Sequence, residues 1–242
     1  MEVKSFKMGL RDGIPICLGY ISVSFAFGIF AVGSGLSVLE ATLISLLNVT
    51  SAGQLAAVPI IAAGGSYIEL MLTQLVINLR YSLMSVSLSQ KLGESVRLRD
   101  RFLMAFANTD EIFAVSYSKE GTVGRRYFYG LMLTPILGWT GGTLLGALAG
   151  NILHELVTSA LGIAIYAMLL AIFIPASRDD SKVALCVALS VALSCIFYFV
   201  PLLNAIPSGF VIIICSVSAS LLFALVCTIP DSDDQKEASD NA

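Results

Sequence analysis

The chain has 242 residues, of which 57% are hydrophobic and only 13% are charged. Soluble domains carry about 25% charged residues, so the composition excludes an ordinary soluble protein and indicates an integral membrane protein. The net charge of −3 says little about partners, because much of the acid lies in a polar run at residues 231–237. We expect residues 1–230 to form a single integral membrane domain and residues 231–242 to form a disordered acidic tail.

Seven long apolar stretches follow one another along the chain. Each reaches the length of roughly 20 residues that a helix needs to cross a bilayer. They cover residues 14–36, 38–63, 68–88, 127–150, 152–175, 183–203 and 207–229. The sequence therefore predicts an all-α fold, a polytopic bundle of membrane helices.

Four clusters of positive residues constrain how these stretches cross the membrane. The clusters lie at residues 4–11, 91–101, 119–126 and 178–182. Positive residues favour the cytoplasmic side, but full crossings by the first three stretches would place residues 91–101 outside. The conflict disappears if residues 38–63 form a re-entrant hairpin, broken at the polar and small residues 48–54, and both termini then lie in the cytoplasm. The alternative is a full crossing, with residues 91–101 as an exception to the rule.

Residues 102–118 start and finish between two basic clusters and contain Asp110 and Glu111. The segment is short for a membrane span, so it forms either a second re-entrant element or an interfacial helix. In the first case the chain has two broken elements. Secondary transporters use such elements to build binding sites near the midplane of the bilayer.

Arg80 lies inside the third apolar stretch, where an unpaired guanidinium is costly. Glu69 is about 16 Å away along a helix axis, so the partner of Arg80 must come from another part of the fold. We expect either a structural ion pair with Asp110 or Glu111, or a place on a substrate path. One face of the same helix is polar and is expected to face a pathway or another polar helix. Its residues are Gln74, Asn78, Tyr81, Ser82, Ser85 and Ser89.

A stripe of glycines recurs at every fourth position of the stretch at residues 127–150. The stripe consists of Gly138, Gly142, Gly146 and Gly150. This spacing is typical of membrane helices that approach each other closely. We expect the stripe to contact another helix of this chain or a helix of a second subunit, and it carries no information about a substrate.

Two observations argue against an enzyme or a metal protein. The five cysteines are scattered through the sequence without a CxxC pair or a histidine spacing that suits a metal. His154 is the single histidine, so an H-E-x-x-H motif is absent, and no nucleophile and base pair stands out. We predict no cofactor, no metal, no enzymatic activity and no nucleic-acid partner.

Several short motifs occur in a characteristic order. They are Gly13-Ile14-Pro15-Ile16-Cys17-Leu18-Gly19-Tyr20 with Phe25-Ala26-Phe27-Gly28, then Ser51-Ala52-Gly53-Gln54, then Asn78-Leu79-Arg80-Tyr81, then Thr109-Asp110-Glu111 with Phe113-Ala114. In this order and spacing they resemble the large subunit of the branched-chain amino acid exporters, the azaleucine-resistance (AzlC-type) family. The second half of the chain is similar mainly through Trp139-Thr140-Gly141-Gly142 and its hydropathy.

The resemblance implies a multi-pass protein of the cell inner (plasma) membrane that exports leucine, isoleucine, valine or methionine. It also implies an obligate partner, a small four-helix membrane subunit of the AzlD type. One position departs from the family. Gly162 stands where many members carry an aspartate, so no role for an acid can be carried over there.

A zwitterionic amino acid requires a positive group for its carboxylate, a negative or carbonyl-rich group for its ammonium, and a pocket for its side chain. Helix ends near residues 51–54, or Arg80, can bind the carboxylate. Asp110 or Glu111 can bind the ammonium or carry a coupling proton, and the alternative for both is a helix cap on a solvated face. The predicted substrate-binding or coupling residues are Ser51, Gly53, Gln54, Asn78, Arg80, Asp110 and Glu111.

The resemblance thus implies an exporter, which we expect to be driven by the proton-motive force. A passive channel for a small solute or ion is the alternative, because it would also have broken helices and a polar stripe. Rings of one charge sign or a dense carbonyl filter would favour the channel, and the sequence contains neither.

Overall fold

The computed structural model describes residues 2–150 continuously and, beyond them, residues 170, 174–175, 177–178, 180–201, 203 and 206–226. The chain divides into two compact units, residues 1–171 and 172–242, and each is described by itself. Most of the expected span at residues 152–175, including Gly162, and the expected tail at residues 231–242 lie outside the described residues.

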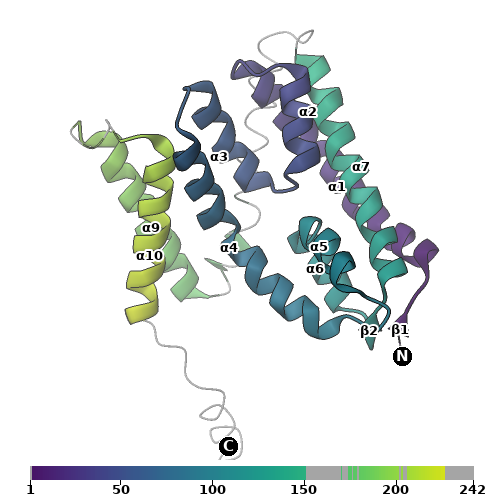
Figure 1. Ribbon diagram of the computed structural model, residues 1–242. Coiled ribbons are helices and arrows are strands. Elements are labelled where there is room, and N and C mark those ends of the chain that lie inside the picture. Colours follow the sequence, from purple (N-terminus) through teal and green to yellow (C-terminus); the bar gives the residue numbers. More distant parts are fainter. Residues whose placement is uncertain are drawn as a thin grey trace, which may run out of the picture. The chain divides into compact units, whose positions relative to one another are not determined.

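The described residues confirm an all-α fold (Figure 1). The first unit contains β1 (Glu2–Val3), α1 (Phe6–Gly33), α2 (Val38–Leu47), α3 (Ser51–Ala62), α4 (Tyr67–Lys91), α5 (Leu98–Phe106), α6 (Asp110–Tyr117), β2 (Thr122–Val123) and α7 (Arg125–Gly150). The second unit contains α9 (Ser181–Phe199) and α10 (Ser208–Val226). Within the described part of the chain, α1, α7, α9 and α10 are long and apolar enough to cross a membrane, which confirms a polytopic bundle.

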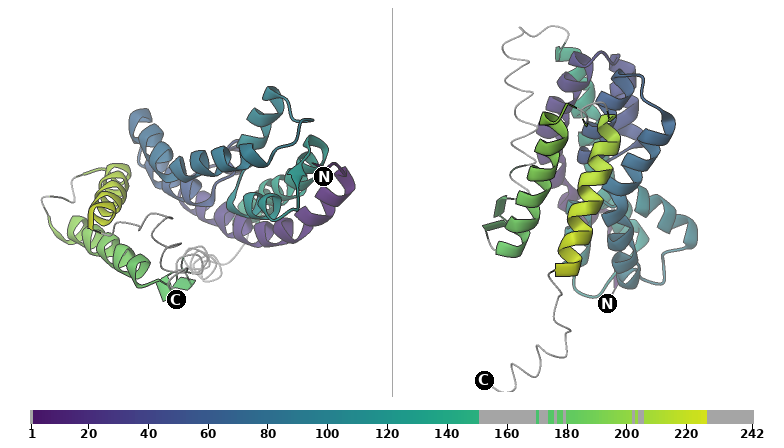
Figure 2. Two further views of the ribbon diagram at one scale, coloured as in Figure 1. Left: turned by 90° about the horizontal axis from the view of Figure 1, so that it is seen from below. Right: turned by 90° about the vertical axis from the view of Figure 1, so that its left-hand side faces the viewer.

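α1 and α7 lie side by side in the first unit and run in the same direction (Figures 1 and 2). The strands that precede them pair in parallel, with Glu2 opposite Thr122. The glycine stripe of α7 is the surface that contacts α1, since a Cβ atom added at Gly142 would lie 2.7 Å from the Ile21 carbonyl oxygen. Of the two neighbours expected for the stripe, the structure shows a helix of the same chain, packed as closely as small residues allow.

α2 and α3 form a re-entrant hairpin at the end of the unit where α1 finishes. Ala41 in α2 and Val58 in α3 both pack against the last turns of α1. The break at residues 48–50 lies near the middle of the unit, because Val49 joins the buried cluster that contains Tyr20 of α1. The two helices have 10 and 12 residues, so each is about half as long as the bilayer core is thick. The expected hairpin is confirmed, and a full crossing is excluded.

α5 and α6 form a second hairpin at the opposite end, where α1 and α7 begin (Figure 1). They have 9 and 8 residues and are separated by a break at residues 107–109. Lys119, just beyond α6, forms a 2.7 Å ion pair with Asp12 in the first turns of α1, which ties the hairpin to that end. Of the two structures expected for residues 102–118, the re-entrant element is correct.

The first six helices contain an internal repeat of opposite orientation. In each half a long helix, α1 or α4, is followed by two half-length helices, and α1 and α4 run in opposite directions (Figure 1). A trace of the repeat remains in the sequence, where Gly35-Leu36-Ser37-Val38 leads into α2 and Gly93-Glu94-Ser95-Val96 precedes α5. Inverted repeats of this kind are common in secondary transporters.

The contact between α1 and α7 predicts that Gly142→Leu destabilises the protein. The new side chain would collide with the α1 backbone, and overpacking of this kind costs about 1–3 kcal/mol or more. Gly141→Leu is the matched control, because a Cβ atom at Gly141 meets nothing within 4 Å, and we expect it to change stability by less than about 0.5 kcal/mol. Thermal unfolding of the purified variants measures both effects, and equal stability of the two would contradict the packing described for the stripe.

The two hairpins also predict which loops face which side of the membrane. Ala63, at the end of α3, and Glu94, before α5, are both exposed and lie at opposite ends of the first unit. Since the basic clusters favour the cytoplasm, we expect a membrane-impermeant thiol reagent applied to intact cells to label Ala63→Cys and to leave Glu94→Cys unlabelled. The unsubstituted protein measures the background from its own cysteines. Labelling of Glu94→Cys alone would show that the first unit has the opposite orientation in the membrane.

Candidate functional site

In each hairpin, the helix that follows the break begins without the usual side-chain cap. At the ends of the first unit, Ser37 and Glu40 cap α2 reciprocally, and the Ser66 hydroxyl accepts the Glu69 backbone N–H at 3.1 Å. The N-cap residues of α3 and α6 are Thr50 and Thr109, and neither side chain caps its own helix. Both hydroxyls bind neighbouring helices instead, which leaves the positive ends of two half-helices near the middle of the unit.

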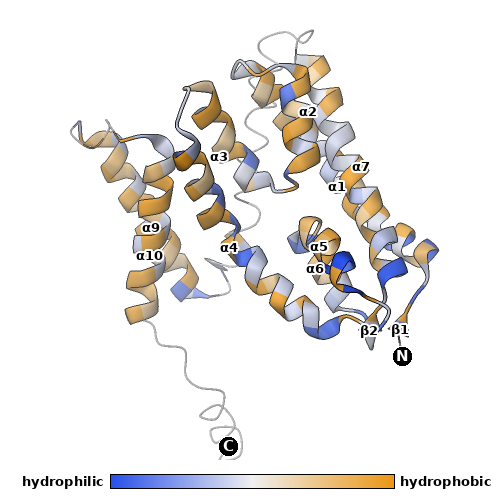
Figure 3. Cartoon of the chain, viewed as in Figure 1, coloured by the Kyte–Doolittle hydropathy of each residue, from blue (hydrophilic) through white to orange (hydrophobic). Residues whose placement is uncertain are grey.

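The polar face of α4, for which the sequence predicts a pathway or a polar helix as neighbour, contacts the first break. Figure 3 shows hydrophilic positions along this helix. The Thr50 hydroxyl donates to the Asn78 side-chain oxygen at 2.9 Å. Gln74 donates to the Gly53 carbonyl oxygen at 2.8 Å and accepts from the Asn78 amide at 3.2 Å. Backbone that leaves a helix at membrane depth needs such partners, because no water is available there. Asn78 and Gly53 therefore lie together, with Ser51 on the first turn of α3.

Arg80 has its expected partner from elsewhere in the fold. Its guanidinium forms a 2.8 Å ion pair with Asp110, the first residue of α6. About half of each side chain remains exposed, at 46% for Arg80 and 43% for Asp110. The pair therefore joins α4 to the second hairpin and still offers free hydrogen-bonding positions to a ligand.

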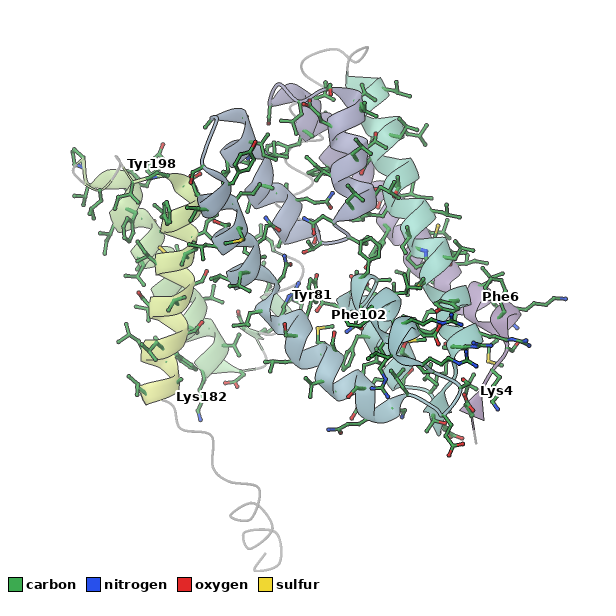
Figure 4. All side chains as sticks on the ribbon, in the orientation of Figure 1. Lys4, Phe6, Tyr81, Phe102, Lys182 and Tyr198 are labelled. Atoms are coloured by element: carbon green, nitrogen blue, oxygen red, sulfur yellow. The ribbon has the colours of Figure 1, made fainter. Side chains whose placement is uncertain are left out.

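Tyr81 connects this ion pair to the first hairpin (Figure 4). The Arg80 guanidinium donates to the Tyr81 hydroxyl at 3.4 Å and lies over its ring. The same hydroxyl lies 3.5 Å from the Thr50 hydroxyl. Both distances are near the upper limit for a hydrogen bond. A polar path thus runs from Asp110 at one break to Thr50 at the other.

Glu111 has a different environment from its neighbour Asp110. Its carboxylate accepts a short hydrogen bond from the Tyr20 hydroxyl of α1, which also lies 2.7 Å from the Thr109 hydroxyl. A phenol has one hydrogen, so Tyr20 donates to the carboxylate and accepts from Thr109. The two adjacent acids are thus held by different helices, Asp110 by α4 and Glu111 by α1.

Gln54 is separated from these residues and binds the opposite side of the hairpin. It is fully buried, and its side chain donates to Ser45 at 2.7 Å and accepts from the Trp139 indole at 2.8 Å. Ser45 in turn lies 2.6 Å from the Thr143 hydroxyl of α7. Trp139 also contacts the Tyr20 ring edge to face, with ring centres 5.1 Å apart. This buried network fixes the first hairpin to α7.

Sequence reasoning missed several residues of this region. Thr50 and Thr109 received no role, although each stands directly before the start of a half-helix and follows an asparagine by one or two positions. Tyr20 and Trp139 were noted only as parts of motifs. The shared Pro-Ile and Leu-Gly-aromatic pattern of α1 and α7, at residues 15–20 and 135–139, was the available signal.

No group of three or more histidine, cysteine, aspartate or glutamate side chains that could hold a metal occurs among the described residues. The chemistry available in the described site consists of one ion pair, a second carboxylate held by a phenol, amide and hydroxyl groups, and two helix ends.

Comparison with known proteins identifies the family. The model of the AzlC protein family matches residues 15–153, more than half of the chain. The chain belongs to the AzlC family. It is 38% identical over 172 residues to an uncharacterised membrane protein of Archaeoglobus fulgidus, covering 70% of this chain and 75% of that protein. It is 29% identical over 235 residues to the inner membrane protein YgaZ of Escherichia coli, covering 94% of each chain. No solved structure matches the chain.

The AzlC match extends from the third turn of α1 to just beyond the end of α7, so it includes both hairpins and the ion pair between Arg80 and Asp110. Membership of this family makes the chain a membrane protein related to transport.

The buried network around Gln54 predicts that Gln54→Leu lowers stability by about 1–3 kcal/mol, because the Trp139 indole N–H loses its acceptor in a buried position. Gln90→Leu, on the exposed side of α4, serves as the control and should change stability by less than about 0.5 kcal/mol. Trp139 is the single tryptophan, so its fluorescence reports unfolding of the same region. Equal stability of the two variants would show that the network contributes nothing.

Proposed function

We propose that this protein is the large subunit of an exporter of branched-chain amino acids, namely leucine, isoleucine and valine, with methionine as a further substrate. The observation that carries the proposal is the meeting of two re-entrant hairpins from opposite ends of the unit beside the ion pair of Arg80 and Asp110. Secondary transporters place substrate sites where broken helices of inverted repeats meet near the midplane. Membership of the AzlC family supports the same conclusion.

The ion pair suits a zwitterionic substrate. Arg80 uses one nitrogen in its 2.8 Å contact with Asp110 and can bind a carboxylate through two parallel hydrogen bonds. Asp110 can accept the substrate ammonium. In this proposal the amino acid takes the place of the direct contact, with its carboxylate on Arg80 and its ammonium on Asp110. The positive end of α3, at Ser51, adds to the attraction for the carboxylate.

Glu111 suits the coupling of export to the proton-motive force. Its carboxylate is held by the Tyr20 hydroxyl of α1 and takes no part in the ion pair. Binding of a proton removes the negative charge that Tyr20 stabilises, and so weakens the link between α6 and α1. A carboxylate inside a membrane protein whose protonation alters a contact between helices is a common coupling device.

The exposed face of α4 supports a second subunit. Large apolar side chains on this face are about 60–70% exposed in the chain, in an almost continuous ridge. They are Ile68, Met71, Leu75, Leu79 and Leu83. We propose that a small four-helix membrane subunit of the AzlD type completes the exporter. We also propose that the complex lies in the cell inner membrane, with both termini in the cytoplasm, where the basic clusters favour placing them.

Export measurements test the proposal. Cells that express this chain together with the small subunit should accumulate leucine, isoleucine and valine in the medium, and cells with either subunit alone should not. Arg80→Ala should abolish export, and Arg80→Lys should reduce it at least about tenfold, because a point charge does not replace the planar fork. Arg99→Gln removes an exposed cation outside the site and should leave export unchanged.

Neutral substitutions of Asp110 and Glu111 should impair transport in different ways. Asp110→Asn should lose both concentrative export and the exchange of external for internal substrate, because the ammonium partner is missing. Glu111→Gln should lose concentrative export and retain exchange, because only the coupling proton is missing. If the purified complex conducts substrate without saturation and without coupling to a proton gradient, the protein is a channel and the proposed exporter is wrong.

A further inference from the structure

A groove runs between the last two turns of α4 and the outer face of α5. Its volume is about 240 Å³, and its lining is almost entirely apolar. Leu88 and Met104 form its floor and are only 3% and 1% exposed. Leu98 and Phe102 also line it and are 71% and 72% exposed; Phe102 is labelled in Figure 4. The groove is therefore narrow, apolar and open along one side.

The groove is basic at one end. Arg101 lines it, and its guanidinium makes no hydrogen bond or ion pair with the described residues. Lys91, Arg97 and Arg99 are close to its lining residues in the sequence. Residues 91–101 contain two acids, Glu94 and Asp100. The Asp100 carboxylate already accepts hydrogen bonds from the Tyr129 hydroxyl and the Arg97 backbone N–H. The end of the groove that lies near the end of α4 therefore attracts an anion.

We propose that the groove binds an anionic phospholipid, with one acyl chain between α4 and α5 and the phosphate on Arg101. Basic pockets between membrane helices on the cytoplasmic side bind the headgroups of such lipids. The position agrees with this chemistry, because the apolar part follows the last turns of α4 and the cation lies near the start of the next helix, α5. The inference does not depend on which substrate the protein transports.

Two other occupants fit the groove less well. A helix of a partner subunit is about 10 Å across and would not enter a space of this size. A zwitterionic amino acid would require an acceptor for its ammonium, and no carboxylate lines the groove. An acyl chain with an anionic head uses both the apolar walls and the unpaired arginine.

Occupancy of the groove would affect the proposed transport site. α4 carries Arg80, and the hairpin of α5 and α6 carries Asp110. Ser85 lines the groove and also accepts a hydrogen bond from the Asn108 side chain at the break between α5 and α6, at 3.1 Å. A bound acyl chain fills the space between these elements and so holds the two halves of the ion pair at their present separation.

Native mass spectrometry of the full-length protein in detergent tests the proposal. The probes are dioleoyl phosphatidylglycerol and dioleoyl phosphatidylcholine, which share acyl chains and differ in net charge. We expect the first to bind more tightly. Arg101→Gln should weaken it about fivefold, the effect of one basic residue near an anionic lipid surface, and should leave phosphatidylcholine unchanged.

Two further variants and one competitor decide between a specific groove and general attraction. Ala105→Leu places a larger side chain at the exposed lining of the groove and should weaken both lipids. Arg99→Gln removes a neighbouring cation that does not line the groove, so it should weaken phosphatidylglycerol binding less than Arg101→Gln does and leave phosphatidylcholine binding unchanged. Loss of phosphatidylglycerol binding in Arg99→Gln as large as in Arg101→Gln, or normal binding in Ala105→Leu, overturns the proposal. Equal competition by soluble glycerol phosphate also overturns it, because the acyl chain would then contribute nothing.

Discussion

The close contact of α1 and α7 is the constraint on which the rest of the first unit depends. Gly138 and Gly142 allow the α1 backbone to approach to distances that any side chain would prevent. The parallel pairing of β1 and β2 then sets the register of the two helices. This register matters, because Trp139 of α7 holds the first hairpin through Gln54 and Tyr20 of α1 holds the second. The close packing of α1 against the glycines of α7 thus positions the polar groups.

The breaks at membrane depth are stable only because neighbouring side chains satisfy their backbone. An unpaired carbonyl or N–H in this environment costs several kcal/mol. α4 supplies the partners at the first break, where the Gln74 side-chain nitrogen donates to the Gly53 carbonyl oxygen. A Cβ atom at Gly53 would lie 2.5 Å from the side-chain oxygen of the same Gln74 amide, so this approach requires a glycine. Of the long described helices, the one with the most polar face is therefore the one that passes beside both breaks. Its polar side chains stabilise the irregular backbone at the breaks, in addition to any part they take in a pathway.

Much of the fold followed from sequence because membrane helices obey simple rules. Apolar length gave α1, α7, α9 and α10, and the charge clusters indicated the hairpin that became α2 and α3. The spacing of polar residues on α4 correctly indicated a polar neighbour. The partner of Arg80 was narrowed to Asp110 or Glu111, and the structure shows Asp110. No single-helix periodicity could separate these acids, because their roles depend on whether α4 or α1 lies beside each one.

The orientation of the Gln54 side chain shows the same limit of prediction from sequence. A buried amide beside a helix break indicated a need for partners, but not on which side of the hairpin they would lie. The structure places them on α2 and α7, away from Asn78 and Gly53. Residues that are neighbours in a motif thus serve two different surfaces, one that anchors the hairpin and one that faces α4.

The inverted repeat also explains where charge lies in the proposed mechanism. Tyr20 of α1 binds the N-cap Thr109 of the second half, and Asn78 of α4 binds the N-cap Thr50 of the first half, so each long helix holds the break of the other half. By this correspondence Ser22 and Ser51 occupy the places of Arg80 and Asp110. Both charges therefore belong to the half formed by α4, α5 and α6. If the halves rock against each other during transport, the ion pair and its substrate move as one body. The contacts across the halves, which include those of Tyr20, Tyr81 and Thr50 and the bond from Gln74 to Gly53, must then break.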